Sequence, residues 1–266
     1  MLDDISADQI RVYFDQHPVF SRYASQVCFA LTGSYAVGLG GRGADVDVLV
    51  LCPGALYEAV KHELAAAGRI GEGDEPEEEF ADLVGDYSLE SLTTIWQRVQ
   101  RYDDMTALFI YGNLVYLAGN RELLDLLVSH CRQIPPAALR EAVEQARGMM
   151  GQGIYAYLRS FQNADSVARL LARAEIVRQA MRLAFLGEGM APPYDKHLFR
   201  LLPGLTPGEQ LSGLIRQFLD ESVEVAEAAA YGAAAATADW HAMYGVAGQT
   251  PVLRFQSEVL RLLGLS

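Results

Sequence analysis

Two aspartates, Asp45 and Asp47, stand at alternate positions at the start of a predicted apolar strand, Asp45–Leu51. Aspartate is depleted in strands, and strand geometry places residues i and i+2 on the same face. Two carboxylates held about 4 Å apart in a partly wet site repel by roughly 4 kcal/mol. A divalent cation turns that repulsion into binding, and Mg²⁺ prefers one or two carboxylates together with substrate phosphates. The pair therefore predicts a magnesium site.

Groups suited to phosphate binding precede the two aspartates. Gly33 lacks a Cβ, so backbone can approach a ligand closely there, and Ser34 adds a hydroxyl. The residues that follow offer backbone N–H groups if they open a helix. Arg42 offers a forked guanidinium, which matches the geometry of phosphate. With the two aspartates, these groups fit one nucleoside triphosphate.

This arrangement resembles the DNA polymerase beta-like nucleotidyltransferase superfamily, whose signature is Gly-Ser, a spacer, and Asp-x-Asp at the start of a strand. Here Gly33-Ser34 is followed by ten residues and then by Asp45-Val46-Asp47. Ala44 replaces the serine that often precedes the first aspartate, at a position that carries no metal ligand. The resemblance covers roughly the first half of the chain. It implies transfer of a nucleoside monophosphate, in the first place AMP from ATP, to a hydroxyl, with one or two Mg²⁺ ions and release of pyrophosphate.

Members of this superfamily commonly use a third acid on a neighbouring strand, which completes the metal site or acts as base. The candidate strand is Phe80–Leu92, where alternation places Asp86 and Glu90 on one face. We expect Glu90 to be the third catalytic and metal-binding residue, with Asp86 as second choice and Asp82 as third. The alternative is that each is a surface acid or a helix cap.

A second glycine pattern lies in the same segment. Residues 38–43 spell G-x-G-x-x-G, a fingerprint that needs a strand before it and a helix after it. Here the pattern runs directly into the strand Asp45–Leu51, so no dinucleotide site is expected. The alternative interpretation of the whole segment is a β-hairpin with a glycine-rich loop and two solvated aspartates.

The fold class expected is α+β, with a small mixed sheet and flanking helices forming a nucleotidyltransferase core at residues 1–134. Pro135-Pro136 marks the boundary, after which strand signals cease and residues 135–266 form an all-helical bundle that covers substrate or nucleotide. In the core the patterns predict strands at 27–32, 45–51, 80–92 and 114–117, and helices at 6–16, 55–67, 91–102 and 121–130. Helices are predicted at 165–186, 209–231 and 252–263 in the bundle.

Apolar residues recur at three- and four-residue spacing in the helix 165–186, which predicts one packed stripe. The stripe consists of Val167, Leu170, Ala174, Val177, Met181 and Ala184.

A polar cluster, Tyr194 to Arg200, follows Pro192-Pro193 in the helical half. It resembles the tails of bacterial proteins that pair a minimal nucleotidyltransferase core with a helical domain. In enzymes of the kanamycin nucleotidyltransferase type, such a domain closes over the nucleotide and supplies a cation. The resemblance implies Lys196 as a nucleotide-binding residue, because an ammonium neutralises triphosphate charge, and His197 as a contact to the acceptor. The alternative is a solvated lysine and a packed histidine.

The composition of the chain limits the classes of binding partner to be expected. The 266-residue chain carries a formal net charge of −13 and has no evident basic track, so a nucleic-acid binder is disfavoured. The acceptor expected is a hydroxylated small molecule, including aminoglycoside-like compounds, while a protein or tRNA acceptor and a homodimer stay open. The three cysteines show no pairing pattern, which is typical of reduced core residues. The acidic start of the chain is no signal peptide, and no apolar run approaches the ~20 residues of a membrane helix, so a cytoplasmic protein is expected.

A second function class stays open. Some members of the superfamily serve as nucleotide sensors or as antitoxin-like partners of a helical toxin, without catalysis. Both Asp45 and Asp47 are present, which favours catalysis over such a binding module. A third function, template-independent addition of nucleotides to RNA, is disfavoured by the missing basic track.

Overall fold

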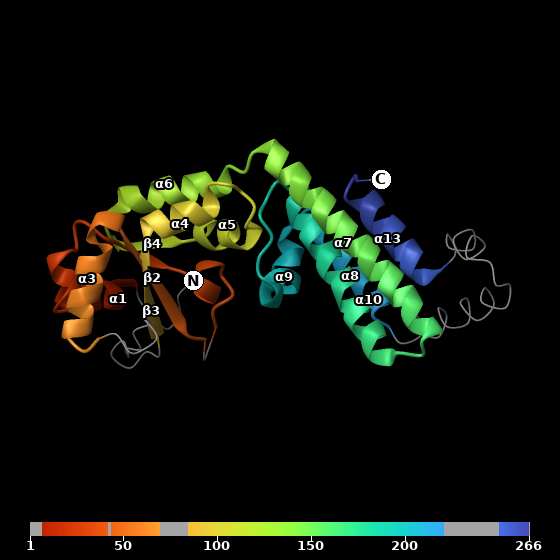
Figure 1. The fold of residues 1–266 in the computed structure, drawn as a ribbon, viewed down its shortest axis with the longest axis horizontal. Coiled ribbons are helices and arrows are strands. Elements are labelled where there is room, and N and C mark those ends of the chain that lie inside the picture. The colour runs from red at the N-terminus through yellow and green to blue at the C-terminus, as the bar shows by residue number, and fades with distance from the viewer. Residues whose placement is uncertain (1–6, 42–43, 70–84, 221–249, 266) are drawn as a thin grey trace. The chain divides into compact units, whose positions relative to one another are not determined.

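The computed structural model describes residues 7–41, 44–69, 85–220 and 250–265. The chain divides into two units, Met1–Ile134 and Pro135–Ser266, shown in Figure 1. The first unit contains a small mixed sheet with helices around it, and the described part of the second contains helices alone. The α+β class expected from the sequence is confirmed. No described helix has the length and apolar character needed to cross a membrane.

The sheet of the first unit has four strands in the order β3-β2-β1-β4. β1 pairs antiparallel with both β2 and β4, whereas β2 and β3 run parallel. The strands are β1 Cys28–Leu31, β2 Val46–Cys52, β3 Gly85–Ser91 and β4 Val115–Gly119. All four lie within or next to the predicted ranges. The parallel pair requires a crossover, and α3, Gly54–Ala66, lies on it. Gly68, with φ +68°, follows that helix in the left-handed conformation common after helix ends.

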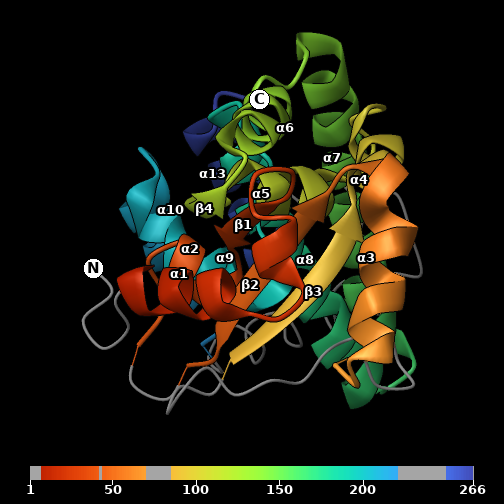
Figure 2. The ribbon, with the colours of Figure 1, turned by 90° about the vertical axis from the view of Figure 1, so that its left-hand side faces the viewer.

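One face of the sheet packs against the N-terminal helix α1, Ala7–Gln16, and against α3 (Figure 2). Ile10 and Phe14 of α1 join a core with Phe29 and Tyr87 of the strands, and the rings of Phe14 and Phe29 stack at 4.2 Å. The 3₁₀ turn η1, Phe20–Arg22, contributes Phe20 to the same core. This burial fixes the strands, because each buried aromatic side chain contributes about 1.5–3 kcal/mol.

The first unit also contains the helices α4 Leu92–Val99, α5 Met105–Gly112 and α6 Arg121–Arg132. The sequence patterns predict α4 and α6 but not α5. The α5 sequence is apolar on nearly every side and most of it is buried, so it carries no helical periodicity. Its start does carry a signal, since Asp104 caps the helix by accepting a hydrogen bond from the Ala107 N–H at 2.9 Å.

The second unit is built on two long helices, α7 Pro136–Gln162 and α8 Ser166–Gly187. Shorter helices follow, namely α9 Asp195–Leu201, the 3₁₀ turn η2 Leu202–Gly204, α10 Gly208–Phe218 and α13 Pro251–Leu262. Phe218 of α10 and Phe255 of α13 stack at 4.4 Å, and Arg173 of α8 donates to the backbone carbonyls of Phe218 and Asp220. These contacts tie α8, α10 and α13 together.

The predicted apolar stripe of α8 is only half correct. Val177, Met181 and Ala184 are buried, but Val167 and Leu170 are two-thirds exposed and Ala174 is exposed as well. The first turns of α8 therefore present apolar side chains to the surface. Periodicity marks one face of a helix, but it does not say how far along the helix a partner covers that face.

Candidate functional site

The two aspartates lie at the start of β2, the second strand from the edge of the sheet. Asp45 directly precedes the strand and is exposed, while Asp47 is the second strand residue and is partly buried. Their neighbours Val46 and Val48 are buried in the core. Strand alternation therefore puts both carboxylates on the face opposite the two valines, with at least one of them open to solvent.

Gly33 lies directly against the carboxylate of Asp47. A Cβ added to Gly33 would stand 1.8 Å from Oδ2 of Asp47, and Gly33 also has φ +65°. Both facts require glycine, because the position has no space for a methyl group and its backbone is left-handed. The Thr32 N–H donates to the Asp47 carbonyl at 2.9 Å, which holds the short helix α2, Gly33–Ala36, beside the start of β2.

The glycine-rich loop after α2 folds back on that helix. The Ser34 carbonyl accepts hydrogen bonds from the N–H groups of Leu39 and Gly40, at 2.9 and 3.0 Å. The Tyr35 ring occupies the space in which a Gly40 side chain would lie, and its hydroxyl donates to the Gly41 carbonyl at 3.3 Å. The loop thus needs its glycines to pack on Tyr35. The described residues after it lead to β2, whereas a dinucleotide-binding fingerprint needs a helix there.

The strand register decides which acid of β3 stands beside the aspartates. In the parallel β2–β3 pair the Cα partner of Asp47 is Asp86, whereas Glu90 is paired with Leu51. Leu51 is four residues beyond Asp47, or about 13 Å along the strand. The backbone therefore places the position of Asp86 next to Asp47 and places Glu90 away from it. Asp82 lies outside the described residues.

Glu90 has another partner. Its Oε2 accepts a hydrogen bond of 2.6 Å from the Tyr111 hydroxyl, so it joins β3 to α5. Burial, and then this hydrogen bond, raise the pKa of Tyr111, so the phenol stays a donor at neutral pH. The expectation that Glu90 completes the acid cluster does not agree with this geometry. Alternation alone could not separate Glu90 from Asp86, because both occupy the same face of β3.

The remaining predicted residues belong to the second unit or lie outside the described residues. Arg42 lies outside the described residues. Lys196 is an exposed residue of α9 in the second unit, with its ammonium 5.2 Å from the centre of the Tyr194 ring. His197 beside it is buried, and burial together with the charges of Lys196 and Arg200 lowers its pKa. A buried neutral histidine fits the packed alternative better than a contact to an acceptor.

Among the described residues no group of three or more His, Cys, Asp or Glu side chains is placed to hold a metal ion. The Asp45–Asp47 pair is still a suitable donor set for Mg²⁺, because that ion usually takes one or two carboxylates and completes its shell with phosphate oxygens and water. Two residues that shape this region were not found from the sequence, namely Tyr35, which packs under the loop of the site, and Tyr111, which binds Glu90 away from the two aspartates. For Tyr35, the one signal in the sequence was its place directly after Gly33-Ser34.

Comparison with known proteins gives a family match for part of the chain. Residues 20–95 match the family described as "Nucleotidyltransferase domain". That stretch contains β1, α2, β2 and β3, and with them Gly33, Asp45 and Asp47. No curated protein matches the chain. A nucleotidyltransferase-like protein from Exiguobacterium sibiricum is similar over 96% of this chain and 74% of its own, at 10% sequence identity and a TM-score of 0.49.

Proposed function

We propose that the protein transfers a nucleoside monophosphate, AMP from ATP in the first instance, to a hydroxyl of a small molecule, a proposal that the match of residues 20–95 to the nucleotidyltransferase domain family supports. The main support for the proposal is the contact of Gly33 with the carboxylate of Asp47. Asp47 follows the exposed Asp45 by two positions. The contact places the start of α2, where Ser34 follows Gly33, against a carboxylate pair that suits a divalent cation.

The reaction is an in-line displacement at the α-phosphorus. The acceptor hydroxyl oxygen forms a bond to that phosphorus, the bond from phosphorus to the pyrophosphate oxygen breaks, and the hydroxyl proton passes to a carboxylate base. Bound Mg²⁺ would neutralise the charge on the phosphates and on the attacking and leaving oxygens. Asp45 and Asp47 would hold the metal, while Gly33 and Ser34 would position the phosphates.

The third acid in this proposal is Asp86 rather than Glu90. The register of β3 supports Asp86, because its Cα is the partner of Asp47, and the hydrogen bond to Tyr111 gives Glu90 a structural role. Asp86 would complete the metal shell or accept the proton of the acceptor hydroxyl. Lys196 remains our candidate for a cation that binds the triphosphate.

A small-molecule acceptor is supported by charge. The net charge of −13 disfavours a polyanionic acceptor such as RNA, whose binding depends on neutralising phosphates with lysine and arginine. A hydroxylated acceptor without phosphate, or one that carries amines, has no such penalty. We therefore place small hydroxylated compounds first in a screen for acceptors.

The test is a calorimetric titration of ATP, GTP, CTP and UTP, each with and without Mg²⁺. It compares the wild-type protein with the double variant Asp45→Asn/Asp47→Asn. Asp8→Asn/Asp15→Asn serves as the matched control, because it removes the same charge from two exposed residues of α1. We expect metal-dependent binding of one nucleotide in the wild type and the control, and none in the site variant.

Binding that survives in the site variant would refute the two-aspartate site. If no nucleotide binds the wild-type protein, catalysis is refuted in favour of the partner-binding alternative, an antitoxin-like module without activity. Once binding is established, pyrophosphate release in the presence of candidate acceptors identifies the acceptor class.

A further inference from the structure

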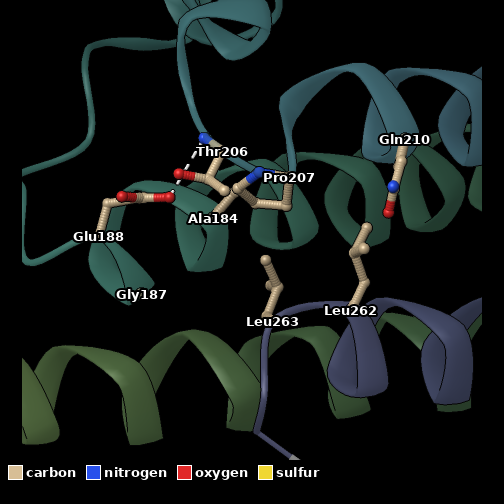
Figure 3. A pocket seen from close by; sticks show the side chains of 8 residues that line it. All are labelled: Ala184, Gly187, Glu188, Thr206, Pro207, Gln210, Leu262 and Leu263. Carbon is tan, nitrogen blue, oxygen red and sulfur yellow. Dashed lines mark hydrogen bonds between the residues drawn. The ribbon is translucent and has the colours of Figure 1, made fainter.

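A cavity of about 350 Å³ lies within the second unit, remote in sequence from the nucleotidyltransferase domain. Figure 3 shows it between the end of α8, the start of α10 and the end of α13. Its size is at the lower end of the range for sites that bind small molecules. The described residues that line it are Ala184, Gly187, Glu188, Thr206, Pro207, Gln210, Leu262 and Leu263.

The cavity has an apolar middle and two polar ends. Figure 3 shows the side chains of Leu262 and Leu263 directed toward Pro207 and Gln210, with Glu188 at the opposite end from Gln210. The leucines and the proline offer contact to a hydrocarbon body, while Gln210 offers an amide at the far end. Glu188 is the one ionisable side chain among the described lining residues.

The Glu188 side chain is exposed, and one hydrogen bond orients its carboxylate. Its Oε1 accepts a hydrogen bond of 3.2 Å from the Thr206 N–H, which joins the end of α8 to the segment before α10. Within the described part of the chain, no partner is found for its second oxygen. A carboxylate fixed by one oxygen and open at the other is arranged to accept a hydrogen bond from a ligand.

The backbone dipoles of two helices, α8 and α13, add negative electrostatic potential to the cavity near Glu188. Glu188 is the C-cap of the 22-residue helix α8, and Leu263 is the C-cap of the 12-residue helix α13. The C-terminus of a helix carries a partial negative charge that attracts cations. The N-terminus of α10 also borders the cavity, but Glu209 in its first turn offsets the positive end of that helix.

We infer that this cavity binds a small organic ammonium, with the cationic nitrogen on Glu188 and an apolar body over Leu262 and Leu263. The site uses none of the residues assigned to nucleotidyl transfer, so this inference does not depend on the proposed function. An anionic ligand is excluded by the carboxylate and the two helix ends. A neutral ligand would not form the ion pair with the Glu188 carboxylate.

The test uses three probes with the same ring and different head groups, namely cyclohexylammonium, cyclohexanol and cyclohexanecarboxylate. Each is titrated into the full-length protein labelled with ¹⁵N, and amide shifts give the dissociation constants and the location. We expect cyclohexylammonium to bind in the millimolar range, with shifts at Gly187, Thr206 and Leu263. Cyclohexanol should bind more weakly, and the carboxylate should not bind.

Three variants identify the contacts. Glu188→Gln should weaken cyclohexylammonium about fivefold and leave cyclohexanol unchanged, because it removes charge but keeps shape. Glu209→Gln is the matched control, since it removes one carboxylate next to the cavity but not from its lining. Leu263→Ala should weaken the amine and the alcohol alike, because both lose the same apolar contact.

Three results would overturn the inference: equal affinity for the amine and the alcohol, the same loss in Glu209→Gln as in Glu188→Gln, or amide shifts outside the cavity. Raising the salt concentration gives a fourth check. Affinity for the amine should fall with salt while that for the alcohol should not, since the ion pair is near the surface and is screened.

Discussion

Replacing Gly33 by alanine tests the geometry on which the proposed site depends. The substitution has two separable effects. At φ +65° an alanine costs about 1–2 kcal/mol of backbone energy relative to glycine. In addition, its Cβ would lie 1.8 Å from Oδ2 of Asp47, where ordinary contacts begin at 3.4 Å. The carboxylate or the α2 backbone must therefore move by roughly 1.6 Å.

Gly38 supplies a matched control. It has φ +72°, so an alanine pays a similar backbone cost, but no described atom lies within 4 Å of an added Cβ there. We expect Gly38→Ala to lose about 1–2 kcal/mol in unfolding free energy and Gly33→Ala at least as much, measured by urea denaturation of the full-length protein. Only Gly33→Ala should also lose metal-dependent nucleotide binding. Turnover in that variant should fall by about a hundredfold or more, because a displacement of 1 Å in a catalytic group has an effect of that size.

Two results would refute this reasoning. If Gly33→Ala binds Mg²⁺ and nucleotide as the wild type does, the position of the Asp47 carboxylate does not matter for binding. If both variants lose binding equally, the loop conformation is what matters, and the contact between Gly33 and Asp47 is not needed to explain it.

Three further predictions follow from the same structure. Asp86→Asn should lower turnover about a hundredfold while Glu90→Gln retains it within a few fold, and the reverse result in steady-state assays of pyrophosphate release would restore Glu90 as the third acid. His17 is buried, its Nδ1 accepts from the Val19 and Phe20 N–H groups, and burial followed by the charge of Arg69 lowers its pKa to about 4. The contribution of neutral His17 to the free energy of unfolding is therefore complete above the unfolded pKa of 6.5. It is lost as the pH falls toward 4, and the free energy of unfolding then decreases by up to about 1.4 kcal/mol per pH unit. Urea denaturation at pH 7, 5.5 and 4.5 should show this slope in the wild type and a shallower one in His17→Gln, and equal slopes would remove His17 as the cause. Lys196→Ala should weaken nucleotide affinity about fivefold in calorimetry, and unchanged affinity would make Lys196 a solvated surface residue.

Local patterns were enough to predict most of the first unit. The strands β1 and β2 and the helices α1, α3 and α6 were predicted nearly at their observed bounds, because each shows apolar periodicity or stands next to a glycine or proline. The pair Asp45 and Asp47 was predicted for a similar reason, since its meaning depends only on strand alternation. The family match over residues 20–95 supports the resemblance that these residues suggested.

The sequence could not show the features that depend on how separate segments pair with one another. Asp86 and Glu90 have the same parity in β3, and only the register against β2 distinguishes them. The exposed half of the α8 stripe has the same periodicity as the buried half, and only tertiary packing separates Leu170 from Met181. The motif assigns Gly33 and Asp47 to one site, but it does not show that these residues, fourteen positions apart, are in direct contact.

The three cysteines give the molecule a reporter that needs no mutation. Cys28, Cys52 and Cys131 are buried free thiols, and all of them belong to the first unit. Burial raises the pKa of Cys28 and Cys131 to about 12 and that of Cys52 to about 11, so very little reactive thiolate is present at pH 8. Alkylation must then wait for the sheet and its helices to open. The rate of thiol labelling therefore measures the opening of the first unit alone, because the second unit contains no cysteine.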